Sequence, residues 1–385
     1  MVPVLFQNEI DCCGCKACAN ACTRNAISFH TNDYGFEYPI INGEKCIGCN
    51  KCVKTCDFQK KGDFGHTPIK GYAARHKDSS VYRNSTSGGT FTALSEWVID
   101  RGGFVYGCVF NEDMVPVHKA VDRLEDLKPM RGSKYVQSDI GFVYRDVKQK
   151  LKENKYVLFV GTPCQVAGLS SYLGNTDSSK LLLVDLVCHG VPSRETFKKY
   201  VSYLENKYRR KVTSFQFRGK LYGWLRPVII VTFEKGKNKW WFSTEDVYYN
   251  HFNKSNLQRS SCFNCKYSCG TRCGDITIGD FWGFQKANLK MSYREGVSCC
   301  LLNTPKSIEV FKSLNLNVEE VPPESIIQGN VHLRRTSPKG KNREMILETI
   351  RKDGFKKLAE DYRKTNKLMF LKAFVKKIVL RKSLK

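Results

Sequence analysis

Residues 11–22 read DCCGCKACANAC, and residues 45–56 read KCIGCNKCVKTC. Both segments space four cysteines as C-x2-C-x2-C-x3-C, and each cysteine of the first segment recurs 34 residues later. The first set is Cys12, Cys15, Cys18 and Cys22, and the second is Cys46, Cys49, Cys52 and Cys56. Two copies of one four-cysteine spacing indicate a duplicated metal-binding loop.

This spacing is typical of a segment that binds two 4Fe-4S clusters. In such a segment the C-x2-C-x2-C part wraps one cluster, while the fourth cysteine reaches the other cluster. The rule predicts two ligand sets, which are Cys12, Cys15, Cys18 with Cys56, and Cys46, Cys49, Cys52 with Cys22. Gly14 and Gly48 occupy equivalent places where the backbone must curl tightly. Cys13 stands outside the pattern, and we expect it to be structural.

The segment resembles the bacterial two-cluster ferredoxin domain. It departs from that domain where a proline usually follows the fourth cysteine, because Thr23 and Asp57 stand there instead. The departure bears on the rigidity of the turn more than on ligation. Eight cysteines binding zinc are the alternative, although zinc sites usually use paired C-x2-C knuckles with longer gaps.

The length and the cysteine content limit the class of protein. With 385 residues the chain is long enough for two or three domains. No apolar run is long enough to span a bilayer, and the first residues do not resemble a signal peptide, so we expect a cytoplasmic protein. Eighteen cysteines in such a chain argue against a disulfide scaffold and favour metal binding.

The chain is strongly basic, with 63 Lys and Arg against 37 Asp and Glu and a formal charge of +26. Such a field favours acidic partners, and an acidic electron carrier such as ferredoxin or flavodoxin suits the two clusters. A basic surface that serves only solubility is the alternative. We do not expect a nucleic-acid binder, since that hypothesis rests on charge alone.

The remainder of the chain alternates predicted strands and helices after a polar linker over residues 57–68. Strands are expected in GYAARH, FVYGCVF, KYVLFVG and LLLVDLV, and helices in TFTALSEWVID, CQVAGLSSYLG and SRETFKKYVSYLENKY. The stretch PVIIVTFEKGKNKWWFSTED is typical of a hairpin, so we expect a mixed sheet. The predicted fold is a small ferredoxin-like domain, a mixed-sheet α/β domain and a helical C-terminal region.

Two loops of this body are candidates for binding an anion. Ser87, Gly88 and Gly89 directly precede a predicted helix, and Gly161 and Thr162 lie between a buried strand and a helix. Free backbone N–H groups at such junctions can face a phosphate. Ordinary turns are the alternative, because neither loop matches a dinucleotide-binding or P-loop motif.

Several ordered motifs resemble the beta subunit family of coenzyme F420 hydrogenase and dehydrogenase. They are STSGG, GSKYVQSD (132–139), GTPCQ (161–165), DLVCHGVPS (185–193), SCFNCKY (261–267) and GDITIGDFWG (274–283). The resemblance covers about residues 70–340, with a ferredoxin-type domain at 1–62 and a basic helical tail at 341–385. It implies an FAD-containing iron-sulfur oxidoreductase that passes electrons to a deazaflavin or another organic acceptor.

The resemblance also implies where a flavin would bind. Ser87, Gly88 and Gly89 would meet its nucleotide, and Gly161, Thr162, Cys164 and Gln165 would line its other side. Lys134 would neutralise a phosphate or stabilise reduced flavin, or else be a solvated surface lysine. Asp280 would orient a loop at the flavin, or else cap a turn.

A third cluster is a further possibility, with two competing ligand sets. One set is Cys164, Cys188, Cys262 and Cys265, and the other is Cys262, Cys265, Cys269 and Cys273. A zinc site and unligated thiols are alternatives. His189 is either a proton donor or a structural histidine, and Cys108, Cys299 and Cys300 are expected to be buried small hydrophobes.

The C-terminal tail contains no acidic residue from Lys364 onward. Leu368, Leu371, Val375 and Ile378 recur at helical spacing between lysines, which is the composition of a helix lying on a membrane surface. A helix docked on its own domain is the alternative. For the whole chain, the alternative to an enzyme is a non-catalytic electron-transfer subunit that feeds a partner enzyme, for example one of surface polysaccharide biosynthesis.

Overall fold

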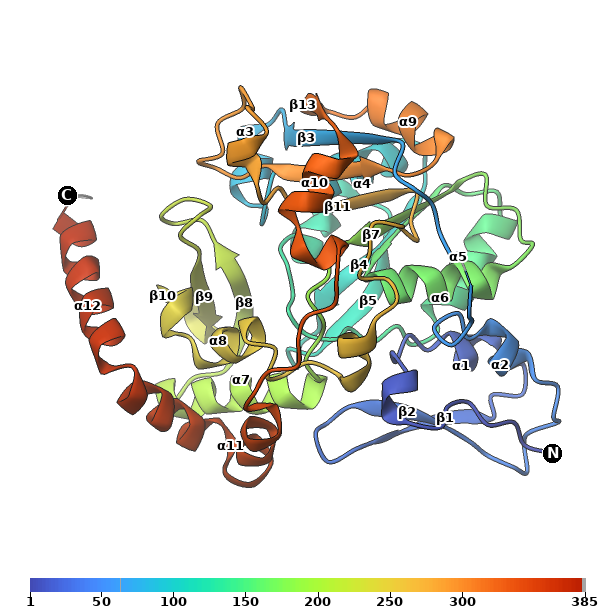
Figure 1. The fold of residues 1–385 in the computed structure, drawn as a ribbon, viewed down its shortest axis with the longest axis horizontal. Helices are drawn as coiled ribbons and strands as arrows, with labels where there is room; N and C mark the ends of the chain where they lie inside the picture. The colour runs from blue at the N-terminus through green and yellow to red at the C-terminus, as the bar shows by residue number, and fades with distance from the viewer. Residues whose placement is uncertain (63, 383–385) are drawn as a thin grey trace.

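The computed structural model describes residues 1–62 and 64–382, so residue 63 of the linker and residues 383–385 of the tail lie outside the described residues. The N-terminal segment is a small unit built on the antiparallel hairpin β1 (Ile27–Thr31) and β2 (Glu37–Ile41). Two short helices, α1 (Ala17–Ala21) and α2 (Lys51–Thr55), pack against each other beside it. Figure 1 shows this unit below the larger sheet, with α1 and α2 facing α6.

An eight-stranded mixed sheet forms the body, in the order β13-β3-β12-β11-β7-β6-β4-β5. Its central strands are parallel, and antiparallel strands complete both sides. The strands are β3 (Lys70–His76), β4 (Phe104–Phe110), β5 (Pro116–Val121), β6 (Val157–Gly161), β7 (Leu181–Leu186), β11 (Ile276–Asp280), β12 (Ser298–Leu302) and β13 (Leu316–Val321). This sheet confirms the predicted mixed α/β fold class.

Helices cover this sheet because its strands are apolar on both faces, as expected where parallel strands are buried. The helices of the body are α3 (Ser79–Arg83), α4 (Thr90–Ile99), α5 (Val143–Lys152), α6 (Pro163–Leu173), α9 (Pro305–Lys312) and α10 (Pro323–Gly329). One buried cluster joins α4, β4, β6, β7, β11 and β12, and a second joins α5 and α6 to the other face. Proline at the first position and a capping box start α6 immediately after β6.

The predicted hairpin exists, but it does not belong to the large sheet. Strands β9 (Val228–Phe233) and β10 (Lys237–Phe242) pair with β8 (Val212–Gly219) in a separate three-stranded sheet. This sheet packs on α7 (Arg194–Tyr208) and α8 (Val247–Asn253) through an aromatic-rich core. The large sheet is mixed because β3, β5, β12 and β13 pair antiparallel with their neighbours. The predicted mixed sheet is therefore confirmed, although the hairpin on which that prediction rested lies in the other sheet.

The C-terminal region consists of α11 (Arg343–Thr365) and α12 (Lys367–Lys382). Gly354 interrupts α11 with φ of 68°, so the chain turns there before continuing as a helix. In Figure 1 these helices run below α7 and then along the outer side of β10. Among the described residues, no helix combines the length and the apolar character that crossing a membrane requires.

Candidate iron-sulfur sites

The structure brings Cys12, Cys15, Cys18 and Cys56 together, and we call this group the proximal site. Cys12, Cys15 and Cys18 come from the loop before and within α1, while Cys56 directly follows α2. Burial, followed by the charges of neighbouring thiols within the group, raises the pKa of Cys18. Gly14 has φ of 71°, in the left-handed region that glycine adopts without strain.

Cys22, Cys46, Cys49 and Cys52 line one small cavity, which we call the distal site. Cys22 follows α1, and the other three cysteines lie on the loop and first turn that lead into α2. Gly48 has φ of 67° at the place equivalent to Gly14. Cys49 is exposed, whereas all four cysteines of the proximal site are partly buried, so the distal site is the more exposed of the two.

Cys164, Cys188, Cys262 and Cys265 line a third cavity inside the body, which we call the body site. The fold explains how two of them meet: β6 and β7 are adjacent parallel strands, and Cys164 and Cys188 follow their carboxyl ends. The short helix at Ser260–Asn264 and the residue after it bring Cys262 and Cys265 to the same edge. Burial raises the pKa of Cys188, and the charges of Cys262, Cys164 and Cys265 raise it further.

The competing set does not converge in the same way. Cys269 and Cys273 are absent from the lining of the body site, which includes Cys262 and Cys265. The Cys269 thiol donates to the carbonyls of Lys266 (3.4 Å) and Thr271 (3.6 Å). Cys273 packs among residues beneath α5 and α6. The geometry therefore favours the set drawn from three separate segments of the body.

Cys13 connects the proximal site to the body site. It is buried, it lines the body cavity, and its thiol hydrogen-bonds to both Cys15 and Cys164. The hydrogen bond from Cys13 is the main cause that lowers the pKa of Cys164 to about 7, with burial acting in the opposite direction. Cys13, which we expected to be structural, therefore lies where the proximal site and the body site meet.

The grouping of these thiols bears on the zinc alternative. Among residues 1–62 and 64–382, no three His, Cys, Asp or Glu side chains come close enough to hold a single metal ion. A zinc ion needs its thiolates within about 2.3 Å, whereas a cubane distributes four thiolates over four irons.

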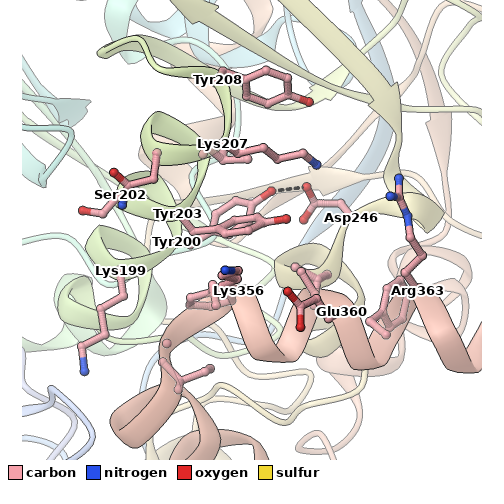
Figure 2. Close-up of a pocket in the computed structure, with 18 of the residues that line it drawn as sticks. Lys199, Tyr200, Ser202, Tyr203, Lys207, Tyr208, Asp246, Lys356, Glu360 and Arg363 are labelled. Carbon is pink, nitrogen blue, oxygen red and sulfur yellow. Dashed lines mark hydrogen bonds between the residues drawn. The ribbon is translucent and has the colours of Figure 1, made fainter.

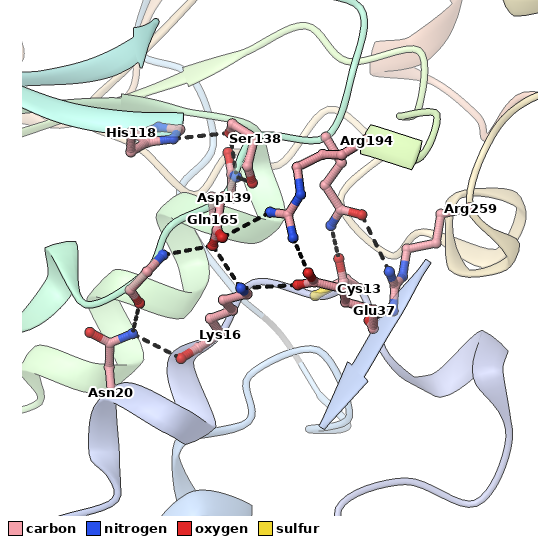
Figure 3. Close-up of polar contacts among 12 residues, drawn as sticks. Cys13, Lys16, Asn20, Glu37, His118, Ser138, Asp139, Gln165, Arg194 and Arg259 are labelled. Atoms are coloured by element: carbon pink, nitrogen blue, oxygen red, sulfur yellow. Dashed lines mark hydrogen bonds and ion pairs between the residues drawn. The ribbon is translucent and has the colours of Figure 1, made fainter. Parts of the chain in front are cut away.

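Charged side chains hold the N-terminal unit against the body (Figure 3). Lys16 pairs with Glu37 (3.0 Å) and Asp139 (2.7 Å), and Arg194 pairs with the same two carboxylates. Burial acts to raise the pKa of Glu37, but Arg194 and Lys16 outweigh it and the pKa is lowered; the pKa of Asp139 is lowered for the same reasons. Two cations alternating with two carboxylates form a cross-linked network rather than isolated pairs.

The first predicted flavin loop uses its polar groups internally. The Gly88 N–H donates to Ser298 Oγ (2.9 Å), and the Ser87 hydroxyl donates to the carbonyl of Val297 (2.6 Å). A Cβ at Gly88 would lie 2.1 Å from the carbonyl oxygen of Ala74, and Gly89 has φ of 92°. Both glycines are thus required by close packing and by the turn.

The second predicted flavin loop is similarly satisfied. The Thr162 N–H donates to Gln165 Oε1 (3.0 Å), and the Thr162 hydroxyl contacts Cys164 Sγ (3.2 Å). Gln165 is buried and donates to Ser138 Oγ (3.0 Å). A Cβ at Gly161 would lie 3.2 Å from Gln165 Oε1. These residues form a helix cap beside the body site, in which the Thr162 N–H and the Gln165 amide donate within the protein.

Lys134 and Asp280 both lie in polar networks. The Lys134 ammonium donates to the carbonyls of Met130, Arg131 and Gly132 at 3.2–3.3 Å, and burial lowers its pKa, so the solvated alternative is wrong. Asp280 ends β11 and pairs with Arg218 (2.9 Å) in a little-exposed ion pair. It also accepts a hydrogen bond from Trp224 Nε1 (3.2 Å). Asp280 thus holds side chains of β8 and of the turn that follows β8 against the end of β11.

The remaining predicted residues are structural in this arrangement. His189 lies 2.7 Å from His332 through ring nitrogens, and Ser337 also contacts its Nδ1 (3.2 Å). Burial lowers the pKa of His189, and of His332 to about 4, so we expect both rings to be neutral at pH 7. Cys299 and Cys300 are buried in β12, and Cys108 lies in β4.

A groove of about 920 Å³ lies away from the cysteines, between α7 and α11 (Figure 2). Its lining includes Lys199, Lys207, Lys356 and Arg363. Burial and the charge of Arg363 lower the pKa of Lys207. Asp246 accepts hydrogen bonds from Tyr200 and, at 2.7 Å, from Trp241 Nε1. No motif in the sequence predicted this basic groove, because its residues come from four distant segments.

Two family models match parts of the chain. Residues 11–60 match the 4Fe-4S dicluster domain, and residues 154–325 match the C terminus of the coenzyme F420 hydrogenase/dehydrogenase beta subunit. These segments contain the eight cysteines of the ferredoxin-like pattern and all four cysteines of the body site.

One curated relative matches a short segment. Ketoisovalerate oxidoreductase subunit VorC of Methanothermobacter marburgensis is 37% identical over 51 residues, which is 13% of this chain and 65% of that protein. A chain of the F420-reducing [NiFe] hydrogenase complex from Methanosarcina barkeri superposes with a TM-score of 0.45 and 17% identity, covering 81% of this chain and 94% of that one. The chain thus combines a segment that matches a 4Fe-4S dicluster domain with a longer segment that is similar to the C terminus of the coenzyme F420 hydrogenase/dehydrogenase beta subunit.

Proposed function

We propose that the chain is an iron-sulfur electron-transfer component of an oxidoreductase, with 4Fe-4S clusters at the proximal, distal and body sites. A bound cubane accepts and releases single electrons. The protein supplies the thiolates and leaves the distal site, with its exposed Cys49, the most accessible to a donor. One observation carries this proposal: Cys13 lines the body cavity and interacts with Cys15 of the proximal site and Cys164 of the body site, so these two cysteine groups adjoin each other.

We infer the direction of electron flow from the solvent exposure of the three sites. Cys49 of the distal site is exposed, whereas the body site is enclosed by α6, β7 and the 260–268 segment. We propose that an acidic electron carrier, such as ferredoxin or flavodoxin, docks near Cys49. The formal charge of +26 would attract such a carrier. The rate of anaerobic reduction by an acidic ferredoxin should therefore fall as ionic strength rises, and a rate independent of salt would contradict this docking.

The acceptor of the electrons is a separate part of the proposal. The match of residues 154–325 to the C terminus of the beta subunit supports FAD and a deazaflavin or other organic acceptor, but the N–H groups of Gly88 and Thr162 in the predicted flavin loops donate within the protein. We therefore assign no step to a flavin. The second candidate is a subunit that passes electrons to a partner enzyme, including one of surface polysaccharide biosynthesis. Flavin released after reconstitution with FAD and denaturation favours the first hypothesis, and dye reduction without bound flavin favours the second.

The C-terminal helix supports a peripheral contact with a membrane. One face of α12 is docked on the body, since Ala373 is buried and Lys377 pairs with Glu245 (2.8 Å). The opposite face exposes Leu368, Leu371, Phe374, Val375, Ile378 and Val379. The docked face corresponds to the hypothesis of a helix packed on its own domain, and the exposed apolar face corresponds to the hypothesis of a helix lying on a membrane surface. We propose that the apolar face, flanked by Lys372 and Lys376, lies on an anionic lipid surface.

Vesicle sedimentation of the full chain tests this contact. We expect binding to phosphatidylcholine vesicles that contain phosphatidylglycerol, and much less binding to phosphatidylcholine alone. Phe374→Asp should abolish the binding, whereas Met345→Asp, which adds the same charge at an equally exposed place on α11, should retain it. Equal binding by the two variants, or a Phe374-dependent dimer without lipid binding, would refute the proposal.

Iron analysis of matched cysteine variants tests the three sites. After anaerobic reconstitution we expect about twelve irons per chain, four for each cubane. Cys188→Ser should lose about four irons, whereas Cys269→Ser should lose none, because only Cys188 lines the body site. About eight irons in the unaltered chain, or a loss confined to Cys269→Ser, would contradict the body site. Far-ultraviolet circular dichroism of each variant controls for folding.

A further inference from the structure

Arg259 is a buried cation with no carboxylate partner among the described residues. Its side chain is 1% exposed, and no carboxylate oxygen in residues 1–62 and 64–382 forms an ion pair with it. Nε donates to the carbonyl of Cys12 (2.7 Å), Nη2 to the carbonyl of Glu37 (2.9 Å) and Nη1 to Gln137 Oε1 (3.3 Å). All three acceptors are formally neutral, and Figure 3 shows Arg259 beside Glu37 and Cys13.

The guanidinium lies between the proximal site and the body site. A Cβ on Gly14 would be 3.0 Å from Nη1, so the side chain touches the loop that carries Cys12 and Cys15. Arg259 itself precedes the short helix that carries Cys262. One cation therefore lies against the loop of the proximal site and directly precedes the segment that carries Cys262 of the body site.

Burying an unpaired charge is costly unless something compensates it. Hydrogen bonds to three neutral oxygens compensate only part of that cost. A cubane held by four thiolates carries net negative charge, and its reduction adds one more, so a nearby buried cation stabilises the reduced state. The aromatic ring of Tyr38, 4.2 Å from the guanidinium carbon, helps to exclude water from this place.

We propose that Arg259 is a positioning residue that raises the midpoint potential of the proximal cluster relative to the distal cluster. The proposal rests on the proposed function, since it requires a cluster at the proximal site. The distal site contains the exposed Cys49, so water screens charges there more strongly. Electrons that enter at the distal cluster would then settle on the proximal cluster, toward the body. The distal cluster serves as an internal reference.

A redox titration of the full reconstituted chain, monitored by electron paramagnetic resonance, tests the proposal. Arg259→Met should lower the midpoint potential of the proximal cluster and leave that of the distal cluster unchanged. Arg259→Lys, which keeps the charge, should restore most of the difference. Unchanged potentials in a loaded Arg259→Met protein would overturn the proposal.

A second pair of variants decides the matter if Arg259→Met does not fold or load. Gln137→Glu loses the donor to the Cys13 carbonyl but places a carboxylate beside Nη1 and neutralises the cation, whereas Gln137→Met loses both hydrogen bonds of Gln137 without adding charge. We expect a lower proximal potential in Gln137→Glu than in Gln137→Met, and equal values would refute the role of charge. Absence of any proximal signal in the unaltered chain would instead refute the proposed function.

Discussion

Asp185 is a carboxylate whose loss should destabilise both the fold and the body site. It is 0% exposed, in β7, and accepts hydrogen bonds from Arg272 Nη2 (3.2 Å) and from the N–H groups of Cys273 (2.9 Å) and Gly274 (3.1 Å). Arg272 is also buried, and it lines the body site. Asp185→Asn leaves Arg272 charged but without its ionic partner. The substitution also points an amide N–H group at the N–H groups that donate to the Asp185 carboxylate.

Breaking a buried ion pair by removing one partner costs about 3–5 kcal/mol. The asparagine oxygen can still accept one backbone hydrogen bond, so we expect a loss of about 3 kcal/mol in the free energy of unfolding. Urea unfolding followed by circular dichroism measures it. Glu320→Gln is the matched control, because it removes the same charge from the exposed pair with Lys70 (2.9 Å), and such pairs contribute about 0–1 kcal/mol.

The double variant Asp185→Leu with Arg272→Met removes both charges and should recover part of the loss, since replacing a whole buried pair by apolar groups is often neutral. Asp185→Asn should also reduce the iron content, because the 272–274 segment supports the wall of the body site. If Asp185→Asn costs no more than Glu320→Gln, the reasoning about this buried pair is wrong.

Three other groups of contacts give further predictions. Gly168→Ala should reduce proximal iron binding, because its Cβ would lie 3.0 Å from Cys15 Sγ, whereas Gly43→Ala, whose Cβ would come no closer than 3.6 Å to a neighbouring atom, should bind iron normally. Cys13→Ala should lower the proximal midpoint potential with unchanged iron content, since hydrogen bonds to cluster sulfurs favour reduction, and an unchanged potential would count against the bridge. The fold lowers the pKa values of Glu37 and Asp139. Their ion pairs therefore stabilise the docked N-terminal unit fully above the carboxyl pKa of the unfolded chain, which is about 4. This stabilisation is lost as the pH falls through the lower pKa values that the two carboxyl groups have in the folded protein. Limited proteolysis of the apoprotein should therefore release the N-terminal unit below about pH 4, and Glu37→Gln should reduce that dependence on pH.

Local sequence patterns predicted much of the fold. The apolar runs that became β6 and β7, and the helices α4, α6 and α7, follow from periodicity and from the glycines and prolines that bound them. The place of the hairpin was mispredicted because strand pairing between distant segments leaves no local pattern. The body site could be named as one of two alternatives, but only the adjacency of β6 and β7 brings Cys164 to Cys188.

Other features of the site depend on contacts that a sequence does not display. The glycines of the STSGG loop suggested an anion site, yet Gly88 is required by the carbonyl of Ala74 in β3. Arg259 has no distinguishing spacing, and its importance appears only where its guanidinium meets the carbonyl of Cys12 from 247 residues away. Long-range hydrogen bonds of this kind decide which of several plausible motifs face one another.

The central claim is that three cysteine groups hold three iron-sulfur clusters along one path. Anomalous X-ray scattering at the iron edge, from crystals of the anaerobically reconstituted chain, tests it most directly. The account predicts three iron peaks, which lie within the proximal site, within the distal site, and among Cys164, Cys188, Cys262 and Cys265. Two peaks alone, or a third peak beside Cys269 and Cys273, would contradict it.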